Sequence, residues 1–347
     1  MQKKVLVAIS GGVDSAVSLH LLKKQGYLCE SGIMRLRDRG QENDIALAHL
    51  VAEKENVPFH IFDFRALFKT CVTDYFVHSY QNALTPNPCV ECNRFIKSKA
   101  LFDEADKLSC SFLATGHYAK VVKDESGYHL YRANDKKKDQ SYFLYPFKKE
   151  FLSRLILPLG DFTKQETRET ALKAFLPNAS KSDSQDICFI SNGDYVSYIK
   201  NYEKENKEGA VFEKSGDIIY KGKVVGKHKG LISYTIGQRS KLGVSVGHPV
   251  YVIQLDKATN SLILGEKEEL VSKILTIRNI NMLENKSDEF ECEVKIRSTT
   301  PAFAAIARRT EEDEIILTFP YGVTAVSKGQ SAVMYNGDLL LGGGIIS

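Results

Sequence analysis

The sequence predicts an α/β chain with an N-terminal doubly wound parallel sheet, followed by two small β-rich domains, the last of them a β-barrel. Strand-like apolar runs alternate with helical runs from residue 5 onward, an order typical of a parallel sheet with helices on both faces. After about residue 205, glycines separate short β-prone runs, which indicates small all-β units. The chain has 347 residues, too many for one small core. We therefore predict domains at 1–200, 208–267 and 268–347.

The first strand, Val5 to Ile9, is an apolar run that breaks at a Gly-Gly pair. Apolar spacing from Val13 onward predicts a helix that ends at Gly26. Further predicted strands cover 28–36, 57–64 and 112–115, and further predicted helices cover 42–55, 68–80, 93–105 and much of 148–177. In the last domain, the runs 291–296, 314–319 and 332–335 predict barrel strands.

A glycine-rich loop, Ser10-Gly11-Gly12-Val13-Asp14-Ser15, joins the first strand to the first helix. Free backbone N–H groups and the helix dipole favour phosphate at such a place. The loop has neither G-x-x-x-x-G-K-[ST] nor G-x-G-x-x-G, the two commoner nucleotide-binding patterns. A strand-turn-helix without a ligand is the alternative, but two hydroxyls and a carboxylate around the glycines favour nucleotide binding.

The same loop resembles the PP-loop, the pyrophosphate-binding loop of ATPases that cleave ATP to AMP and pyrophosphate. By that resemblance, the pyrophosphate is held by Ser10, Gly11, Gly12 and Ser15. Asp14 would help to place Mg²⁺, a hard cation that prefers carboxylate and phosphate oxygens.

Composition narrows the class of protein. The formal net charge of +4 permits a nucleic-acid partner without demanding one. No apolar run approaches the length of a membrane span, and Ser10 to Gly12 interrupt the first apolar run too early for a signal peptide. We therefore expect a cytoplasmic protein without a membrane partner. Seven cysteines, an odd number, argue against a disulfide framework.

Three of the cysteines, Cys89, Cys92 and Cys188, are candidates for chemistry. Two prolines, at 86 and 88, are expected to hold the chain extended up to Cys89. Cys89 and Cys92 would then lie at or just before the N-terminus of the helix predicted from Asn93, a position that lowers the pKa of a thiol and makes it reactive. Cys188 belongs to a short apolar segment, 187–190. The lysine run 136–138 is, on its own, typical of a solvated loop.

Nine stretches, in order and spacing, resemble the tRNA-specific 2-thiouridylase family, whose members replace the C2 oxygen of the wobble uridine of certain tRNAs by sulfur. The stretches are 10–15, 86–97, 114–119, 138–144, 185–189, 234–239, 295–297, 328–332 and 341–346. The resemblance implies an ATP-dependent sulfurtransferase that acts on tRNAs of the Lys, Glu and Gln type. Adenylation turns a poor leaving group, oxide, into a good one, AMP, which explains why a PP-loop and a sulfur site share one chain.

By the same resemblance, Cys188 carries the incoming sulfur as a persulfide, which a cysteine desulfurase or a relay protein supplies. Cys92 assists, either by releasing the sulfur as a disulfide forms with Cys188 or by acting on the persulfide. Both roles require the fold to bring the two thiols together over the glycine loop.

The remaining roles are implied position by position. The implied ATP-binding residues are Ala8, Ile9, Ser10, Gly11, Gly12, Val13, Asp14, Ser15, Met34 and Gly116. The residues implied to face the target base are Asn87, Pro88 and Cys89. The implied tRNA contacts are His117, Lys138, Asp139, Gln140, Arg297, Ser298 and Gln330, which replaces the solvated-loop interpretation of Lys138.

The sequence departs from the family at Cys89, where many members have an acidic residue. Cys89, Cys92 and Cys188 together could hold a four-iron–four-sulfur cluster with one open iron, whereas a zinc site lacks a clear fourth ligand. We favour the persulfide over the cluster, in which case Cys89 is a bystander. A PP-loop ligase or amidase for a small molecule and a non-catalytic RNA-binding protein are further alternatives, but neither needs Cys92 and Cys188.

Overall fold

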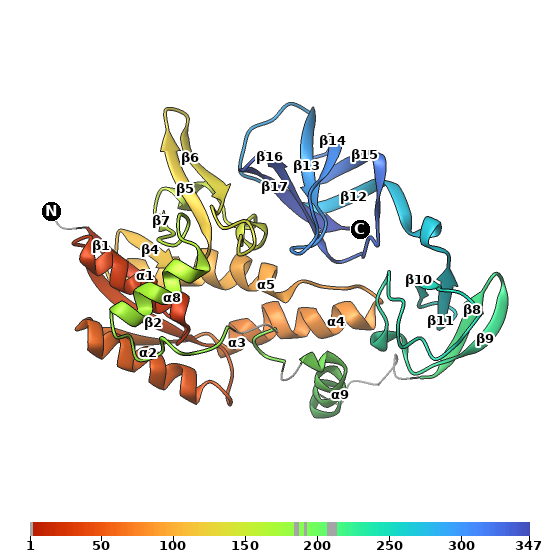
Figure 1. Cartoon of the computed structure of the whole chain (residues 1–347), viewed down its shortest axis with the longest axis horizontal. Helices are drawn as coiled ribbons and strands as arrows, with labels where there is room; N and C mark the ends of the chain where they lie inside the picture. Colours follow the sequence, from red (N-terminus) through yellow and green to blue (C-terminus); the bar gives the residue numbers. More distant parts are fainter. Residues whose placement is uncertain (1–2, 184–186, 191–192, 207–213) are drawn as a thin grey trace.

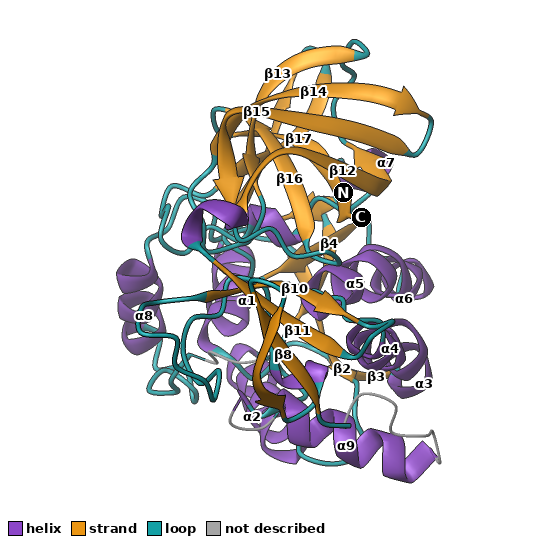
Figure 2. Ribbon diagram, turned by 90° about the vertical axis from the view of Figure 1, so that its right-hand side faces the viewer, coloured by secondary structure: helices purple, strands orange, loops and turns teal. Residues whose placement is uncertain are grey.

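The computed structural model describes residues 3–183, 187–190, 193–206 and 214–347. It contains three sheets: a five-stranded parallel sheet near the N-terminus, a four-stranded sheet, and an eight-stranded sheet that includes a closed barrel (Figure 1). These sheets agree with the predicted fold class, and the domain limits stay a prediction. The barrel lies beside the parallel-sheet domain, as a second view shows (Figure 2).

The parallel sheet has the strand order β3-β2-β1-β4-β7. Its strands are β1 (Lys4–Ala8), β2 (Leu28–Arg35), β3 (Phe59–Asp63), β4 (Phe112–Thr115) and β7 (Leu155–Ile156). Because alternate residues of a strand face opposite sides, Val5 and Val7 enter one core and Leu6 enters another. Helices α1 (Val13–Lys24) and α2 (Glu42–Glu55) cover the first face, and α6 (Leu101–Lys107) covers the second. Both faces are therefore covered, as the sequence predicts.

Two further helical runs lie between β3 and β4. One comprises α3 (Arg65–Phe68), a wider π-turn segment at Lys69–Asp74 and α4 (Tyr75–Gln81). The other comprises α5 (Pro88–Glu91), a π-turn segment at Cys92–Ala100 and α6. This second run begins at Pro88, not at Asn93 as we expected. Proline is tolerated in the first turn, since its missing N–H needs no partner there, and the Asn87 side chain caps the helix at Val90 N.

The segment 148–177 is less helical than the sequence predicts. It contains α7 (Lys149–Leu152), the short strand β7 and α8 (Lys164–Lys173). A capping box, in which Thr163 and Glu166 each accept from the other's backbone N–H, begins α8. This helix packs on α1, and α9 (Tyr195–Asn206) follows later in the chain.

The eight-stranded sheet has the order β12-β15-β14-β13-β16-β17-β6-β5, and β12 also pairs with β17, which closes six strands into a barrel. The barrel strands are β12 (Val271–Met282), β13 (Glu289–Lys295), β14 (Phe303–Glu311), β15 (Glu314–Thr324), β16 (Ser331–Asn336) and β17 (Leu339–Ile346). The hairpin of β5 (Ala119–Asp124) and β6 (Gly127–Arg132) joins the barrel through Leu339 and Tyr131. This hairpin therefore links the parallel-sheet domain to the barrel.

The four-stranded sheet has the order β10-β11-β8-β9. Its strands are β8 (Gly216–Tyr220), β9 (Lys223–His228), β10 (Tyr251–Asp256) and β11 (Ser261–Gly265). Apolar residues of this sheet share one core with the α3–α4 run, including Val252 and Phe76. The three parts of the molecule are therefore joined by shared packing.

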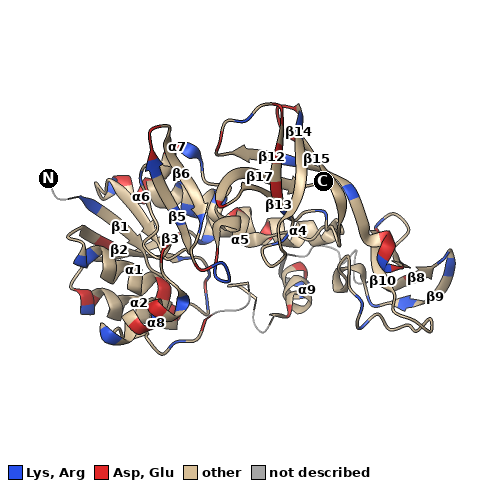
Figure 3. Ribbon diagram, turned by 45° about the horizontal axis from the view of Figure 1, so that its top comes forward, with Lys and Arg blue, Asp and Glu red and all other residues tan. Residues whose placement is uncertain are grey.

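Charged residues of both signs are distributed over the whole molecule. Lys and Arg are interspersed with Asp and Glu over all three parts (Figure 3). Among the residues that the structure describes, no helix is long and apolar enough to cross a membrane. The cytoplasmic location stays a prediction.

Candidate active site

A pocket of about 550 Å³ opens where β1 and β2 end, at the edge of the parallel sheet where ligands of such folds bind. The glycine loop forms one wall. Pro88, Cys89 and Cys92 of the second helical run form another, and Cys188 lines the pocket from a later segment. The fold thus brings the two predicted thiols of the sulfur site to the glycine loop.

Gly11 and Gly116 lie so close to neighbouring backbone atoms that a side chain would not fit at either position. Gly11 has a φ of +72°, and a Cβ on it would lie 2.5 Å from the carbonyl oxygen of Asp44. A Cβ on Gly116 would lie 2.8 Å from the backbone nitrogen of Ser15. The loop can therefore lie against α2 and the end of β4 only because these two positions carry no side chain.

The hydroxyls of the loop are turned toward the loop itself. Ser15 Oγ donates to Gly12 O at 3.1 Å and accepts from Ser10 N at 3.0 Å, and the two serine hydroxyls lie 3.2 Å apart. Ser15 is therefore held at the N-terminal turn of α1, a helix end that favours an anion.

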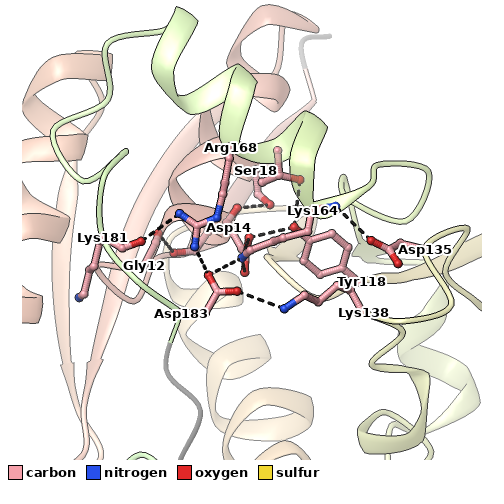
Figure 4. Close-up of polar contacts among 12 residues, drawn as sticks. Gly12, Asp14, Ser18, Tyr118, Asp135, Lys138, Lys164, Arg168, Lys181 and Asp183 are labelled. Atoms are coloured by element: carbon pink, nitrogen blue, oxygen red, sulfur yellow. Dashed lines mark hydrogen bonds and ion pairs between the residues drawn. The ribbon is translucent and has the colours of Figure 1, made fainter.

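Three cations converge on one carboxylate beside this loop (Figure 4). Carboxylate oxygens of Asp183 lie 3.2 Å from Lys138 Nζ and 2.9 Å from Lys164 Nζ. Arg168 Nη2 lies 2.6 Å from the same carboxylate. We refer to Lys138, Lys164 and Arg168 as the cation cluster. Partial burial acts to raise the pKa of Asp183, but the hydrogen bonds and charges of the cation cluster outweigh it and lower that pKa.

Asp14, predicted to place Mg²⁺, has other partners in this structure. Lys164 Nζ lies 2.6 and 2.8 Å from its two carboxylate oxygens, and Tyr118 OH donates to one of them at 2.9 Å. The carboxylate chemistry fits a hard cation, but Mg²⁺ would compete with the Lys164 ammonium for the same oxygens. The magnesium role of Asp14 stays a prediction.

A second ion pair holds the back of the loop. Lys181 Nζ lies 2.6 Å from Asp44 and donates to Gly11 O at 3.2 Å, and Asn178 Nδ2 donates to the same carbonyl at 3.1 Å. The Oδ1 atom of Asn178 is buried without a hydrogen-bond partner among the described residues. Side chains from the segment after α8 thus hold the glycine loop in place.

Neighbouring atoms of the pocket walls desolvate the sulfur atoms of all three thiols. Taken over the whole residue, Cys89 and Cys188 are nevertheless exposed. Desolvation raises the pKa of Cys89 to about 11 and that of Cys92 to about 12, and it raises the pKa of Cys188 as well. The charge of Lys97 acts in the opposite sense on all three. The predicted lowering of the pKa of Cys89 and Cys92 is therefore wrong: desolvation is the largest effect on both thiols, and Cys92 lies within the helical run.

The cysteines do not form a ready cluster site. Across the described part of the chain, no group of three or more His, Cys, Asp or Glu side chains is arranged to hold a metal ion. The residues present do not fit the predicted iron–sulfur cluster in this conformation, and Asp14 remains the candidate for a divalent cation.

His117, an implied tRNA contact, is only 9% exposed. Lys97 has no acceptor, so at 3.1 Å it must donate to His117 Nε2, which leaves Nδ1 to donate to Thr115 Oγ1 at 2.7 Å. Desolvation lowers the pKa of His117 well below its ordinary value, so the ring is neutral. Direct contact of this side chain with RNA does not fit its burial; it positions Lys97, which lines the pocket beside the thiols.

The other implied tRNA contacts have structural partners. Asp139 accepts from Ala133 N and from both the backbone and the hydroxyl of Ser141. Gln140 Oε1 accepts from Tyr118 N at 3.0 Å and lines the pocket.

In the barrel, Gln330 Nε2 donates to Thr85 O at 3.0 Å and to Pro86 O at 3.3 Å. Arg297 donates to Ile236 O, Ala325 O and Ser327 Oγ, and thereby joins the four-stranded sheet's domain to the barrel. Neighbouring Ser298 is partly exposed.

The predicted residues fall into two groups. Those that line the pocket are Ile9, Ser10, Gly12, Val13, Asp14, Ser15, Met34, Pro88, Cys89, Cys92, Lys138, Gln140 and Cys188. Those that support it or lie elsewhere are Ala8, Gly11, Asn87, Gly116, His117, Asp139, Arg297, Ser298 and Gln330.

Sequence reasoning missed the basic residues of α8 and the acidic residue that they contact. The signal was present: Thr163 and Glu166 have the spacing of a capping box, which places Lys164 and Arg168 one turn apart on one helix face. Nothing in the sequence indicates that Asp183 meets that face.

Comparison with known proteins identifies the family of the chain. Residues 3–192 match the tRNA methyl transferase HUP domain, 197–266 the tRNA methyl transferase PRC-barrel domain, and 272–346 the aminomethyltransferase beta-barrel domain. The tRNA-specific 2-thiouridylase MnmA of Clostridioides difficile (strain 630) is 39% identical over 363 residues, covering 100% of this chain and 98% of the relative. The chain belongs to the tRNA-specific 2-thiouridylase family.

A second member of the 2-thiouridylase family, MnmA 1 of Clostridium botulinum (strain Okra / Type B1), is 41% identical over 350 residues, covering 99% of this chain and 98% of its own. Among solved structures, a 4-thiouridine synthetase–RNA complex with bound ATP is 16% identical, with a TM-score of 0.40 over 59% of this chain and 52% of that one. Family membership confirms the predicted resemblance and fold class.

Proposed function

We propose that this protein is an ATP-dependent tRNA-uridine 2-sulfurtransferase, which binds tRNA and ATP and thiolates the wobble uridine. One observation carries the proposal: the glycine loop, Cys92 and Cys188 line a single pocket in a member of the 2-thiouridylase family. An activating site and a sulfur site must meet at the same base, and a shared pocket satisfies that requirement.

The first step activates the base. The C2 oxygen of uridine attacks the α-phosphorus of ATP, pyrophosphate leaves, and the oxygen becomes part of an AMP leaving group. Ser10, Ser15 and the N-terminus of α1 would hold the departing pyrophosphate. Mg²⁺, placed by Asp14, would offset the charge that develops on the phosphates.

The second step transfers sulfur from a persulfide on Cys188. The terminal sulfur attacks C2 and expels AMP, and Cys92 attacks Cys188 Sγ, so that 2-thiouridine leaves as a Cys92–Cys188 disulfide forms. Alternatively, Cys92 attacks the persulfide first, and the released hydrosulfide attacks C2. Both routes reduce the transferred sulfur and oxidise two thiols, so a reductant must restore them before the next turnover.

The thiols are neutral at pH 7, because desolvation raises the pKa of each. Lys97 is the described cation that acts on all three, and its ammonium would stabilise an anionic sulfur as it forms. Asn87, Pro88 and Cys89, at the capped first turn of α5, would face an inserted base.

The test measures 2-thiouridine in nucleosides of a tRNA transcript after incubation with the protein, ATP, Mg²⁺ and a sulfur-loaded cysteine desulfurase. We expect Cys188→Ser to abolish thiolation and to retain tRNA-dependent adenylation, whereas Asp14→Ala loses adenylation itself. Cys71→Ser, a matched change outside the pocket lining, should behave as the wild type. Thiolation by Cys188→Ser would contradict the role of Cys188, and normal adenylation by Asp14→Ala would contradict the role of Asp14.

A cluster held by Cys89, Cys92 and Cys188 is the alternative sulfur carrier. Within the described ranges, no three of the side chains that could ligate a metal are grouped to hold one. Anaerobic purification followed by iron analysis and a visible spectrum decides between the two: we expect a colourless, iron-free protein that thiolates tRNA, and stoichiometric iron would overturn the persulfide mechanism.

A further inference from the structure

We propose that the cation cluster of Lys138, Lys164 and Arg168 binds the phosphates of the nucleotide, and that Asp183 occupies this site with its carboxylate until those phosphates displace it. The inference rests on the proposed function, since it concerns the same pocket. It assigns phosphate contacts to α8 and to Lys138, both outside the glycine loop, and so gives Lys138 a partner other than the tRNA that the family resemblance implies.

The position of the cation cluster supports phosphate binding. Lys164 reaches both Asp14 in the glycine loop, at 2.6 Å, and Asp183, at 2.9 Å (Figure 4). An anion at the N-terminus of α1 would therefore lie within reach of the same ammonium. Phosphate and carboxylate oxygens accept the same charge-assisted hydrogen bonds from Lys and Arg, so one can replace the other.

Local charge supports the exchange. With Asp183 in place, three cations face two carboxylates, Asp14 and Asp183. If Asp183 moves away, two positive charges remain uncompensated at the loop, which suits a polyphosphate better than a single carboxylate. The side chains of Lys164 and Asp183 are only 14% and 22% exposed, so these charges are weakly screened by solvent.

Asp183 and Cys188 both line the pocket. A purely structural ion pair at Asp183 would not compete with phosphate, whereas a carboxylate that occupies the phosphate site would, which makes the two interpretations separable.

Calorimetric titration of the full chain with inorganic pyrophosphate, ATP and adenosine tests the inference. Asp183→Asn should bind pyrophosphate about tenfold more tightly, because an internal competitor has lost its charge. Adenosine, which has no phosphate, should bind equally to both proteins. Asp161→Asn removes the same charge at a side chain that is 75% exposed and outside the cation cluster, and should match the wild type.

Arg168→Gln should weaken pyrophosphate binding, and in the double variant the gain from Asp183→Asn should shrink, since the two residues act through one contact. Weaker or unchanged pyrophosphate binding by a folded Asp183→Asn variant would overturn the inference while ATP binding by the wild type still supports the proposed function. A wild type that binds neither ATP nor pyrophosphate would contradict the proposed function itself.

Discussion

At the scale of single residues, burial decides the chemistry of the site more than helix position does. Cys89 lies in the first turn of a helical run and Cys92 one turn later, yet desolvation raises their pKa to about 11 and about 12. The family resemblance, which residue types and their order carry, implies that the cysteines and the glycine loop share one site, and all of them line the pocket. The sequence cannot predict the sign of the pKa shift, which depends on how closely the pocket walls enclose each thiol.

These pKa values predict the pH dependence of alkylation. A raised pKa means that the thiol stays protonated at neutral pH, so its reaction with iodoacetamide should quicken about tenfold per pH unit from pH 7 to pH 10, without a plateau. Mass spectrometry of the Cys89 and Cys92 peptides follows the rate, with N-acetylcysteine as the reference. A plateau below pH 9 for these peptides would show that their thiolates are stabilised, contrary to the structure.

At the scale of elements, most of the parallel sheet follows from the sequence: β1, β4 and α2 lie where alternating apolar runs place them. The differences arise where local rules compete. Pro88 starts a helix, because Asn87 caps it and the first turn tolerates proline. Strand β7 has only two residues, too few for a periodic signal, and gains its pairing from β4.

The capping box of α8 predicts a graded effect at this scale. Thr163→Ala removes a side-chain cap and should cost about 1 kcal/mol of the free energy of unfolding. It should also weaken pyrophosphate binding, since Lys164 occupies the first turn that the cap holds. Thermal unfolding and calorimetry measure the two effects. Thr170→Ala, a matched change within the same helix, should be neutral or slightly stabilising, because alanine has the higher helix propensity; equal losses for both variants would contradict the capping argument.

At the scale of the whole molecule, the barrel contacts the segment that leads into α5, whose residues line the pocket. Thr85 N donates to Lys328 O at 2.8 Å, and Gln330 donates to the carbonyls of Thr85 and Pro86. Ser331 accepts from Tyr142 OH at 2.8 Å, which joins the barrel to the first domain. The sequence predicts a barrel but not this contact, since residues far apart in the chain carry no local pattern that pairs them.

We predict that Gln330→Ala loosens the segment that leads into α5. Hydrogen exchange of residues 84–92 should quicken without tRNA present, and stability should fall by about 1 kcal/mol, the net value of lost hydrogen bonds. Gln254→Ala, at an exposed position in the four-stranded sheet, is the control. Unchanged exchange in the free protein, combined with weaker tRNA binding, would instead assign Gln330 to RNA contact alone.

In the proposed mechanism, one pocket both activates the base and delivers the sulfur. A single-turnover experiment tests it: protein carrying a ³⁵S-labelled persulfide, freed of its donor, is mixed with tRNA, with or without ATP. We predict that label moves to tRNA only with ATP, and that Cys188→Ser carries no transferable label. Transfer without ATP, or undiminished transfer from Cys188→Ser, would contradict the claim.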